Sequence, residues 1–393
     1  MPSAKAESAP VISGIGVATA FGYGVSTFRQ ALRQPGNRFG VMQRPGRHAL
    51  DATFPGAELP DPPAGILAAR IARTTGLTGH VAVAVLQEAW RDANLDRVAP
   101  EKIGLVIGGS NTQAREHLLI QQSYASKLHF LSPQYGHRFF DSDLCGLCTS
   151  VFPIRGFAYT LGGASASGLL AVQHAADAVR SGRVEACIAL GALQDLSYFE
   201  CQALRSLGAM GSVCRPFDQG RDGFVFGECS AALVLSRSGP GYGRVLGAAH
   251  IADGNRGPEP SLDGEVRAIR MALADAGIAA EEIDYVNPHG TGSPLGDDTE
   301  VAALREAGLT HARINATKSI IGHGLSAAGA VELVAMLLQM TGGFLHPTRN
   351  LENPIAPDLH WANGESFQAR TALKLSFGFG GINTALVAGA LEA

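Results

Sequence analysis

Two histidines in glycine-rich segments are the first residues of this sequence that could do chemistry. His289 lies in VNPHGTGSPLGD, directly after a predicted buried strand, and His323 lies in NATKSIIGHGLSAAG, just before a predicted helix. Lys318 precedes His323, and Glu332 follows it in the predicted helix. A lone histidine in either place would more often be structural. Two of them in matching loops at element ends, with a lysine nearby to perturb them, indicate a catalytic pair.

Two further segments have the composition of functional loops. The segment LSFGFGGIN, residues 375–383, follows a predicted strand, and its glycines allow backbone amides to approach a ligand closely. A phosphate site is the alternative interpretation, but no Gly-Lys-Ser/Thr follows. The segment RPFDQGRDGFVFGE, residues 215–228, is predicted to be an ordered turn whose charges pair with one another, with a functional and a structural role equally open.

A repeated order of elements must position these residues. Apolar spacing predicts a helix over 81–93 and a buried strand over 103–107, and the same order recurs at 264–276 and 283–286. Ser-Ala-Ser-Gly from residue 165 and Ser-Ala-Ala-Gly from residue 326 each open a further helix. The first half has roughly twenty extra residues, around 111–152. Chance likeness of alanine-rich helices is the alternative, but the repetition favours an α/β protein made of two similar halves.

Length and charge exclude several classes of protein. The chain has 393 residues, 46% of them hydrophobic and 17% charged, with a formal net charge of −4. This length favours two domains or one large duplicated unit. No overall positive charge is present to attract nucleic acid or an anionic membrane. No run approaches the roughly eighteen apolar residues of a spanning helix, and MPSAKAESAP does not resemble a signal peptide, so a cytoplasmic location is expected.

The cysteines are predicted to be packed thiols rather than disulfides or metal ligands. Cys145 and Cys148 form a Cys-x-x-Cys pair, but no second pair and no histidine at metal spacing accompanies them. We therefore expect no metal site.

The four segments together resemble one family. HGTGSPLGD, TKSIIGHGLSAAGAVE, SFGFGGIN and RPFDQGRDGFVFGE are similar to segments of the β-ketoacyl-acyl carrier protein synthases, and the resemblance covers nearly the whole chain. It implies the thiolase-like α/β fold, in which two duplicated αβαβα halves form a five-layered body, and it implies a homodimer. We expect the N-terminal half to span residues 1–240 and the C-terminal half to span residues 241–393.

The resemblance also assigns roles to residues. His289 and His323 match the paired histidines of the family's Cys-His-His site, Lys318 matches its active-site lysine, and Glu332 matches its buried structural glutamate.

Three more positions match groups that handle the substrate. Thr291 and Ser293 occupy the hydroxyl positions that hold the phosphopantetheine arm of an acyl carrier protein. Phe379 is similar to the gating phenylalanine whose amide helps to form the oxyanion hole. No other cofactor is expected.

The nucleophile position departs from the family pattern. RGFAYTLGGASASG, residues 155–168, matches the family's frame, but Ser165 stands where the family has cysteine, and Gly163 replaces the usual threonine. A hydroxyl supplies no appreciable anion near neutral pH. The dipole of the following helix stabilises an anion by at most ~2 kcal/mol, which does not offset the difference in acidity between an alcohol and a thiol. The backbone amide of residue 165 remains available for an oxyanion hole.

Decarboxylation survives this change, because in this family the two histidines polarise the malonyl thioester and stabilise the enolate. Each such hydrogen-bond donor is worth ~3 to 4 kcal/mol in the transition state. The chain is therefore similar to the ketosynthase-like decarboxylases of polyketide β-branching cassettes, which convert malonyl-acyl carrier protein to acetyl-acyl carrier protein and CO₂.

Two alternatives stay open. One is a condensing or acyl-transferring enzyme that uses Ser165 covalently, and the other is a non-catalytic partner resembling a chain-length factor. The carrier protein is acidic in this interpretation, so Arg70, Arg73 and Arg205 could contact it, although surface arginines are more often simply solvated.

Overall fold

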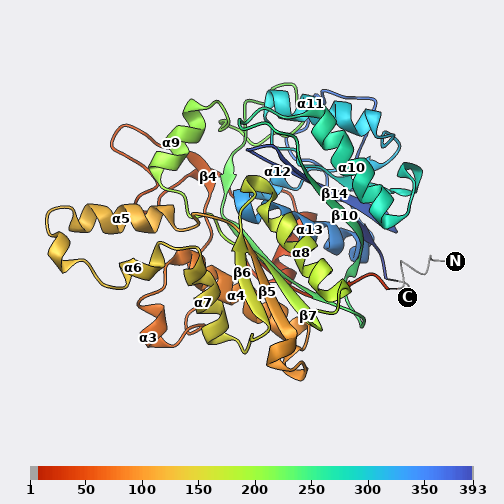
Figure 1. Cartoon of the computed structure of the whole chain (residues 1–393). Helices are drawn as coiled ribbons and strands as arrows, with labels where there is room; N and C mark the ends of the chain where they lie inside the picture. Colours follow the sequence, from red (N-terminus) through yellow and green to blue (C-terminus); the bar gives the residue numbers. More distant parts are fainter. Residues whose placement is uncertain (1–7, 392–393) are drawn as a thin grey trace.

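One long mixed sheet runs through the computed structural model, which describes residues 8–391 (Figure 1). Its strand order is β13-β12-β11-β14-β15-β10-β1-β9-β7-β5-β6, with β2 paired to β1. The N-terminal half contributes β1 Val11–Thr19, β2 Gly22–Tyr23, β5 Ile103–Gly108, β6 Phe157–Leu161, β7 Ala186–Gly191 and β9 Cys229–Ser236. The C-terminal half contributes β10 Gly243–Ala252, β11 Tyr285–Asn287, β12 Arg313–Ile314, β13 His360–Trp361, β14 Thr371–Gly378 and β15 Ile382–Gly389.

The two half sheets meet through a short pairing of β1 with β10, at Val11 with Arg244 and at Ile12 with Gly243. Helices lie on both sides of each half sheet. Those that cover the sheets are α4 Leu77–Asp92, α7 Ser142–Val151, α8 Ser167–Arg180, α10 Leu262–Ala276, α11 Pro294–Glu306 and α13 Ala328–Gly342.

Three apolar clusters show how these helices and sheets are layered. One packs α4 and α7 against the outer face of the N-terminal sheet, a second packs α8 and α13 between the two sheets, and a third packs α10 and α11 against the C-terminal sheet. In β5, Leu105 and Ile107 join the outer cluster while Val106 joins the central one, as alternation along a strand requires. The expected α/β body of two halves and five layers is therefore confirmed.

The repeated helices and strands agree with the structure apart from their ends. The helix expected at 81–93 begins earlier, as Leu77–Asp92, and the helix expected at 264–276 is Leu262–Ala276. The strand expected at 283–286 is Tyr285–Asn287, because Ile283 closes a preceding 3₁₀ turn by donating its N–H to the Ala280 carbonyl.

The extra residues of the first half form a lobe at the left of Figure 1. It contains α5 Ala114–Tyr124, a 3₁₀ turn at Leu128–Phe130, α6 Tyr135–Arg138 and then α7. The smaller helices are α2 Val25–Arg33, α3 Ala69–Ala72, α9 Tyr198–Ser206 and α12 Lys318–Ile321, and a small sheet contains β3 Gly40–Val41, β4 Pro55–Ala57 and β8 Phe226–Gly227.

The segment 215–228 corrects an expectation. Its charges do not mainly pair with one another, because Arg221 lies 2.7 Å from Asp298 of α11 and Glu228 bonds to Arg44 and Arg47 near the N-terminus. The segment lies between α11 and the N-terminal part of the chain, and its charged side chains pair with residues of both.

One segment, Leu325–Gly342, is apolar and long enough to cross a membrane by composition alone, with a mean hydropathy of 1.4. It contains α13, and 83% of it is buried inside the molecule. Its position between the two half sheets accounts for its apolar residues.

Candidate active site

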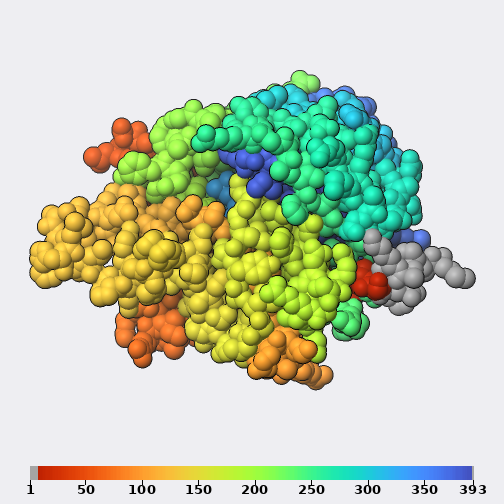
Figure 2. Space-filling model, in the orientation of Figure 1, coloured from red at the N-terminus to blue at the C-terminus, as the bar shows by residue number. Residues whose placement is uncertain are grey.

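A cavity of about 610 Å³ joins the two halves. Its wall includes six of the residues singled out in the sequence: Ser165, His289, Thr291, Ser293, His323 and Phe379. In Figure 2 the surface is hollowed where blue atoms of the C-terminal region lie between teal and yellow atoms. Residues more than two hundred positions apart therefore share one site.

A strained turn presents Ser165 to this cavity. Ala164 has a φ of 47°, a left-handed conformation that is unusual for a residue with a side chain. Ser167 holds the turn, since its hydroxyl donates to the Ala164 carbonyl at 2.7 Å and accepts from the Gly163 N–H at 2.9 Å. A 3₁₀ turn, Ala164–Ala166, then leads into α8.

The C-terminal end of β14 lies directly against this turn. The Ser376 hydroxyl donates to the Ser165 carbonyl at 3.1 Å. A Cβ atom on Gly378 would lie 2.3 Å from the Gly163 carbonyl oxygen, so only glycine permits this approach. The contact brings Phe379, a residue that is 41% exposed, to the same cavity wall as Ser165.

His323 faces Ser165. Its Nε2 lies 2.9 Å from the Ser165 hydroxyl oxygen, and its backbone is fixed to β8 by bonds with Val225 and Gly227. Within residues 8–391 no group bonds to His323 Nδ1, which is buried. A buried N–H without an acceptor is rare, so the proton belongs on Nε2, which then donates into the site.

His289 has the same tautomer for a different reason. The Lys318 ammonium lies 3.4 Å from His289 Nδ1, and an ammonium can only donate. Nδ1 therefore accepts, and Nε2 carries the proton. The two imidazole centroids are 5.5 Å apart at an interplanar angle of 83°. The site thus has two N–H donors from residues of different loops.

A buried group of charges lies behind the histidines. Glu332 of α13 lies 2.6 Å from the ammonium of Lys318 and 2.6 Å from that of Lys374 in β14. Two ammonium groups and one carboxylate leave one net positive charge. Lys374 was not predicted as a site residue, although a lysine within the apolar run TALKLSFG was a usable signal.

Burial and this charge keep both imidazoles neutral. Burial lowers the pKa of His289 and of His323 well below the usual range, and the positive charge of Lys318 lowers both pKa values further. Burial also lowers the pKa of the Lys374 ammonium. The histidines therefore act as hydrogen-bond donors near neutral pH rather than as acids.

Two buried carboxylates shape the loop that carries His289. Glu300 accepts from the N–H groups of His289 and Gly290, and Asp297 accepts from those of Thr291 and Gly292. Burial raises the pKa of Glu300 to about 7 and that of Asp297 to about 6. Neither acid was predicted from the sequence, although their spacing in GDDTE places both on one helix face toward the loop.

The two hydroxyl residues expected at the phosphopantetheine arm line the cavity. Thr291 Oγ1 accepts from the Ser293 N–H, and Ser293 Oγ caps α11 by accepting from the Gly296 N–H. Both oxygens act as acceptors in these contacts within residues 8–391, so each hydroxyl can donate its proton to a ligand. In the part of the chain that the structure describes, no cluster of three His, Cys, Asp or Glu residues is arranged for a metal, and all six cysteines are buried.

Two family models and several curated proteins match most of the chain. Residues 9–239 match the model of the beta-ketoacyl synthase N-terminal domain, and residues 242–352 match that of its C-terminal domain. The chain is 49% identical to the polyketide biosynthesis malonyl-ACP decarboxylase PksF of Bacillus subtilis, over 96% of this chain and 95% of that protein. It is 31% identical to 3-oxoacyl-[acyl-carrier-protein] synthase 2 of Coxiella burnetii, over 96% and 97%.

Solved structures show the same fold. The ishigamide ketosynthase/chain length factor superposes with a TM-score of 0.88 at 27% identity, covering 98% of this chain and 99% of that one. The ketosynthase ApeO in complex with its chain length factor ApeC, from Xenorhabdus doucetiae, superposes with a TM-score of 0.83 at 26% identity, covering all of both chains.

Proposed function

The chain belongs to the β-ketoacyl synthase family, and from that premise we propose that it converts malonyl-acyl carrier protein to acetyl-acyl carrier protein and CO₂ in polyketide β-branching. The observation that carries the proposal is a family active site with both imidazole donors present and serine in place of the nucleophile. The relative that is 49% identical is named a malonyl-ACP decarboxylase, which supports this activity.

The two imidazoles supply what decarboxylation needs. As the bond between the carboxylate carbon and the α carbon breaks, CO₂ leaves and the electron pair moves onto the thioester oxygen. Nε2–H of His289 and Nε2–H of His323 donate to that enolate oxygen. The net positive charge of the Lys318, Glu332 and Lys374 group lies behind them and favours the same negative charge. A proton from water then completes the methyl group of the acetyl product.

The alternative with a covalent Ser165 has one observation in its favour, the 2.9 Å contact with His323. A serine nucleophile needs a base that accepts its proton and a third group that orients the base. His323 Nε2 is a donor in this contact, and Nδ1 has no orienting partner within residues 8–391. This arrangement favours decarboxylation over acyl transfer.

Residues of the cavity wall are proposed to bind the phosphopantetheine arm that carries the substrate. The hydroxyls of Thr291 and Ser293 hold the phosphopantetheine arm, and the amides of Ser165 and Phe379 add an oxyanion hole beside the turn at residue 164. The cavity wall and the close approach of Gly378 support these roles. The reaction takes no metal and no cofactor beyond the phosphopantetheine of the carrier.

The partners follow from the same proposal. The carrier protein docks near the cavity mouth, where α9 contributes Leu204 to the wall and the exposed Arg205 to the surface. The proposed enzyme is a homodimer, and the edge of β6, the last strand of the sheet in residues 8–391, offers a second copy a place to pair. Its proposed location is the cytoplasm. We propose that residues 1–240 form its N-terminal half and residues 241–393 its C-terminal half.

Mass spectrometry of a malonyl-loaded carrier protein tests the reaction directly. Incubation with the enzyme and no acyl primer should remove the mass of one CO₂ from the carrier. A variant with both His289→Ala and His323→Ala serves as the control. Persistence of the malonyl mass at high enzyme concentration, across several carriers, contradicts the proposal. An acyl mass on Ser165 that turns over would favour acyl transfer.

A further inference from the structure

Four polar residues of the cavity lining lie together, and we call them the polar wall: Ser110, Asn111, Gln194 and Ser326. It lies beside the turn that presents Ser165, since a Cβ atom on Gly162 would be 3.2 Å from the Ser110 hydroxyl. The cavity is also lined by the apolar residues Leu204, Leu207 and Phe224, and the centroid of the Phe224 ring lies 5.0 Å from that of His323. The cavity therefore has both a polar and an apolar lining near the Ser165 turn, and Ser110 of the polar wall lies against that turn.

Gln194 holds the polar wall together. Its amide group donates to the Asn111 carbonyl at 2.9 Å and to the Ser110 carbonyl at 3.3 Å. Its side-chain oxygen accepts from the Ser326 hydroxyl at 2.9 Å. Both ends of the side chain are therefore bonded, and the bonds join the segment after β5 to the turn before α13.

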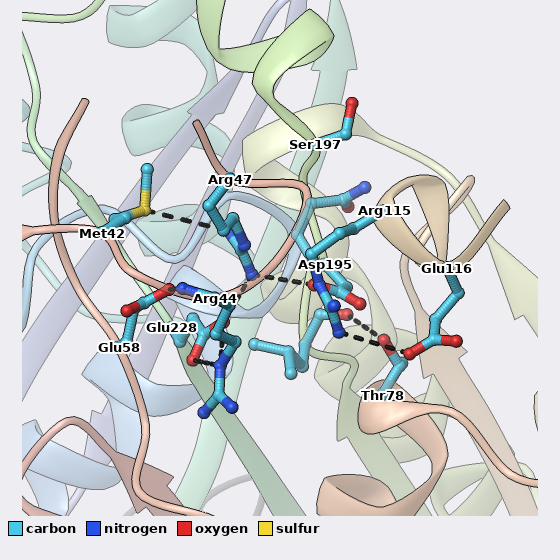
Figure 3. Close-up of polar contacts among 12 residues, drawn as sticks. Met42, Arg44, Arg47, Glu58, Thr78, Arg115, Glu116, Asp195, Ser197 and Glu228 are labelled. Carbon is cyan, nitrogen blue, oxygen red and sulfur yellow. Dashed lines mark hydrogen bonds and ion pairs between the residues drawn. The ribbon is translucent and has the colours of Figure 1, made fainter. Parts of the chain in front are cut away.

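A buried ion network prevents the wall from moving aside (Figure 3). Asp195, next in sequence to Gln194, lies 2.8 Å from Arg47 and 2.8 Å from Arg115, and Arg47 also pairs with Glu228. The Asp195 backbone exchanges bonds with the segment that follows Asn111, because its N–H donates to Thr112 and its carbonyl accepts from Arg115. Charges that are fully buried and paired resist rearrangement, since separating them costs several kcal/mol.

We propose that the polar wall determines acyl specificity, by keeping alkyl acyl groups away from residue 165 while a short, carboxylated malonyl group enters. An alkyl chain that entered there would break bonds of Gln194 without gaining apolar contact, which is unfavourable. A malonyl carboxylate meets the Ser110 hydroxyl and the Asn111 side-chain amide instead, both of which line the cavity. This inference rests on the proposed function for the identity of the substrate, and it deepens that function by explaining why no primer is taken.

The test compares matched Gln–Ser pairs. The variant with Gln194→Met and Ser326→Ala removes both partners of the bond between these two side chains, so neither is left facing an unpaired partner. The Ser110 and Asn111 carbonyls lose the Gln194 donor, but Ser110 is half-buried and Asn111 is exposed, so water can replace it. The control variant with Gln202→Met and Ser206→Ala makes the same changes in α9, where the Gln202 amide donates to the Ser206 hydroxyl at 3.0 Å on the exposed surface. Circular dichroism and melting temperature establish that both variants fold.

Calorimetric titration with acetyl-, butyryl-, hexanoyl- and octanoyl-pantetheine is the readout. In the wild type and the control, affinity should not rise with chain length. In the Gln194→Met and Ser326→Ala variant it should rise, by up to roughly fourfold for each added methylene that becomes buried. The single variant Gln194→Met should show the same trend if the double variant does not fold.

Two outcomes would overturn the inference. One is a wild type whose affinity already rises steeply with chain length, and the other is a folded wall variant whose chain-length dependence equals that of the control. Binding of acyl-pantetheines is measured without turnover, so these outcomes stand apart from a failure of malonyl decarboxylation in the mass assay.

Discussion

The turn that carries Ser165 and the turn that carries Ser326 have the same backbone and different neighbours. In each, the residue before the serine has a positive φ, 47° at Ala164 and 49° at Leu325, and a 3₁₀ turn leads into a buried helix. The two helices, α8 and α13, pack against each other between the half sheets. The repeated sequence therefore produces a repeated local structure.

The surroundings separate the two serines. Ser165 faces His323 at the cavity, whereas Ser326 bonds to Gln194 and to the Ala192 carbonyl. No histidine faces Ser326 in the described part of the chain. One copy of the turn thus serves the reaction and the other supports the wall beside it, so the loops around a repeated turn decide its use.

Removing the histidine that distinguishes the two turns should have the largest effect. His323→Ala should lower kcat for malonyl decarboxylation by about a hundredfold or more, because one oxyanion donor is lost. His289→Ala should do the same. Initial rates of CO₂ release measure both variants, with melting temperature as the folding control. Full activity in both would show that the turn at Ser165 is not the reactive one.

Lys318→Met should lower kcat by roughly tenfold or more, because His289 is then no longer held in the tautomer that donates from Nε2. The sign of the pKa change follows from its causes: burial and the charge of Lys318 both lower the pKa of His289, so loss of the charge raises it. Nitrogen NMR of labelled imidazole measures the tautomer and pKa. An unchanged His289 titration would contradict this role.

Exchanging each serine for alanine sharpens the comparison. Ser165→Ala should keep at least about a tenth of the decarboxylase activity, since its hydroxyl has no covalent role. Ser326→Ala should instead lower stability by about 1 to 2 kcal/mol through lost buried hydrogen bonds, or a few degrees in melting temperature. A correctly folded but inactive Ser165→Ala protein would favour acyl transfer.

The smallest expected effect is on stability, when the residues with positive φ, Ala164 and Leu325, are replaced by glycine. Ala164→Gly should change stability by less than about 1 kcal/mol, because relief of the positive φ offsets the greater entropy of the unfolded chain. Leu325→Gly should cost about 1 kcal/mol or more, since a half-buried side chain is lost. Urea unfolding compares the two variants. Equal losses at both turns would show that burial of the Leu325 side chain contributes nothing to stability at that turn.

Several parts of this molecule can be predicted from neighbouring residues alone. The helix Leu262–Ala276 and the buried strand Ile103–Gly108 follow from apolar spacing, which is a local property of the chain. Ser165 and the two histidines were identified from short motifs, because glycine-rich turns at element ends have recognisable sequences. The chemical consequence of serine for cysteine also follows from the side chain itself.

Other features depended on residues that meet only in the folded chain. Lys374 and Lys318 come from different elements, yet both contact Glu332. No pattern of neighbouring residues in the sequence predicts these contacts. For the same reason the charges of the segment 215–228 were paired wrongly, since Arg221 and Glu228 find partners far away in sequence.

The sequence by itself determined the helices and strands, the repeated order of those elements and the absence of the nucleophilic thiol, because each depends on residues that are neighbours in the chain. Only the tertiary structure decided the two imidazole tautomers and the polar wall. A tautomer depends on which group lies beside each ring nitrogen, and the wall joins Asn111, Gln194 and Ser326 from three distant segments. The contacts of the imidazole nitrogens and of the polar wall form when the two halves pack against each other, so the spacing of residues in the sequence does not predict them.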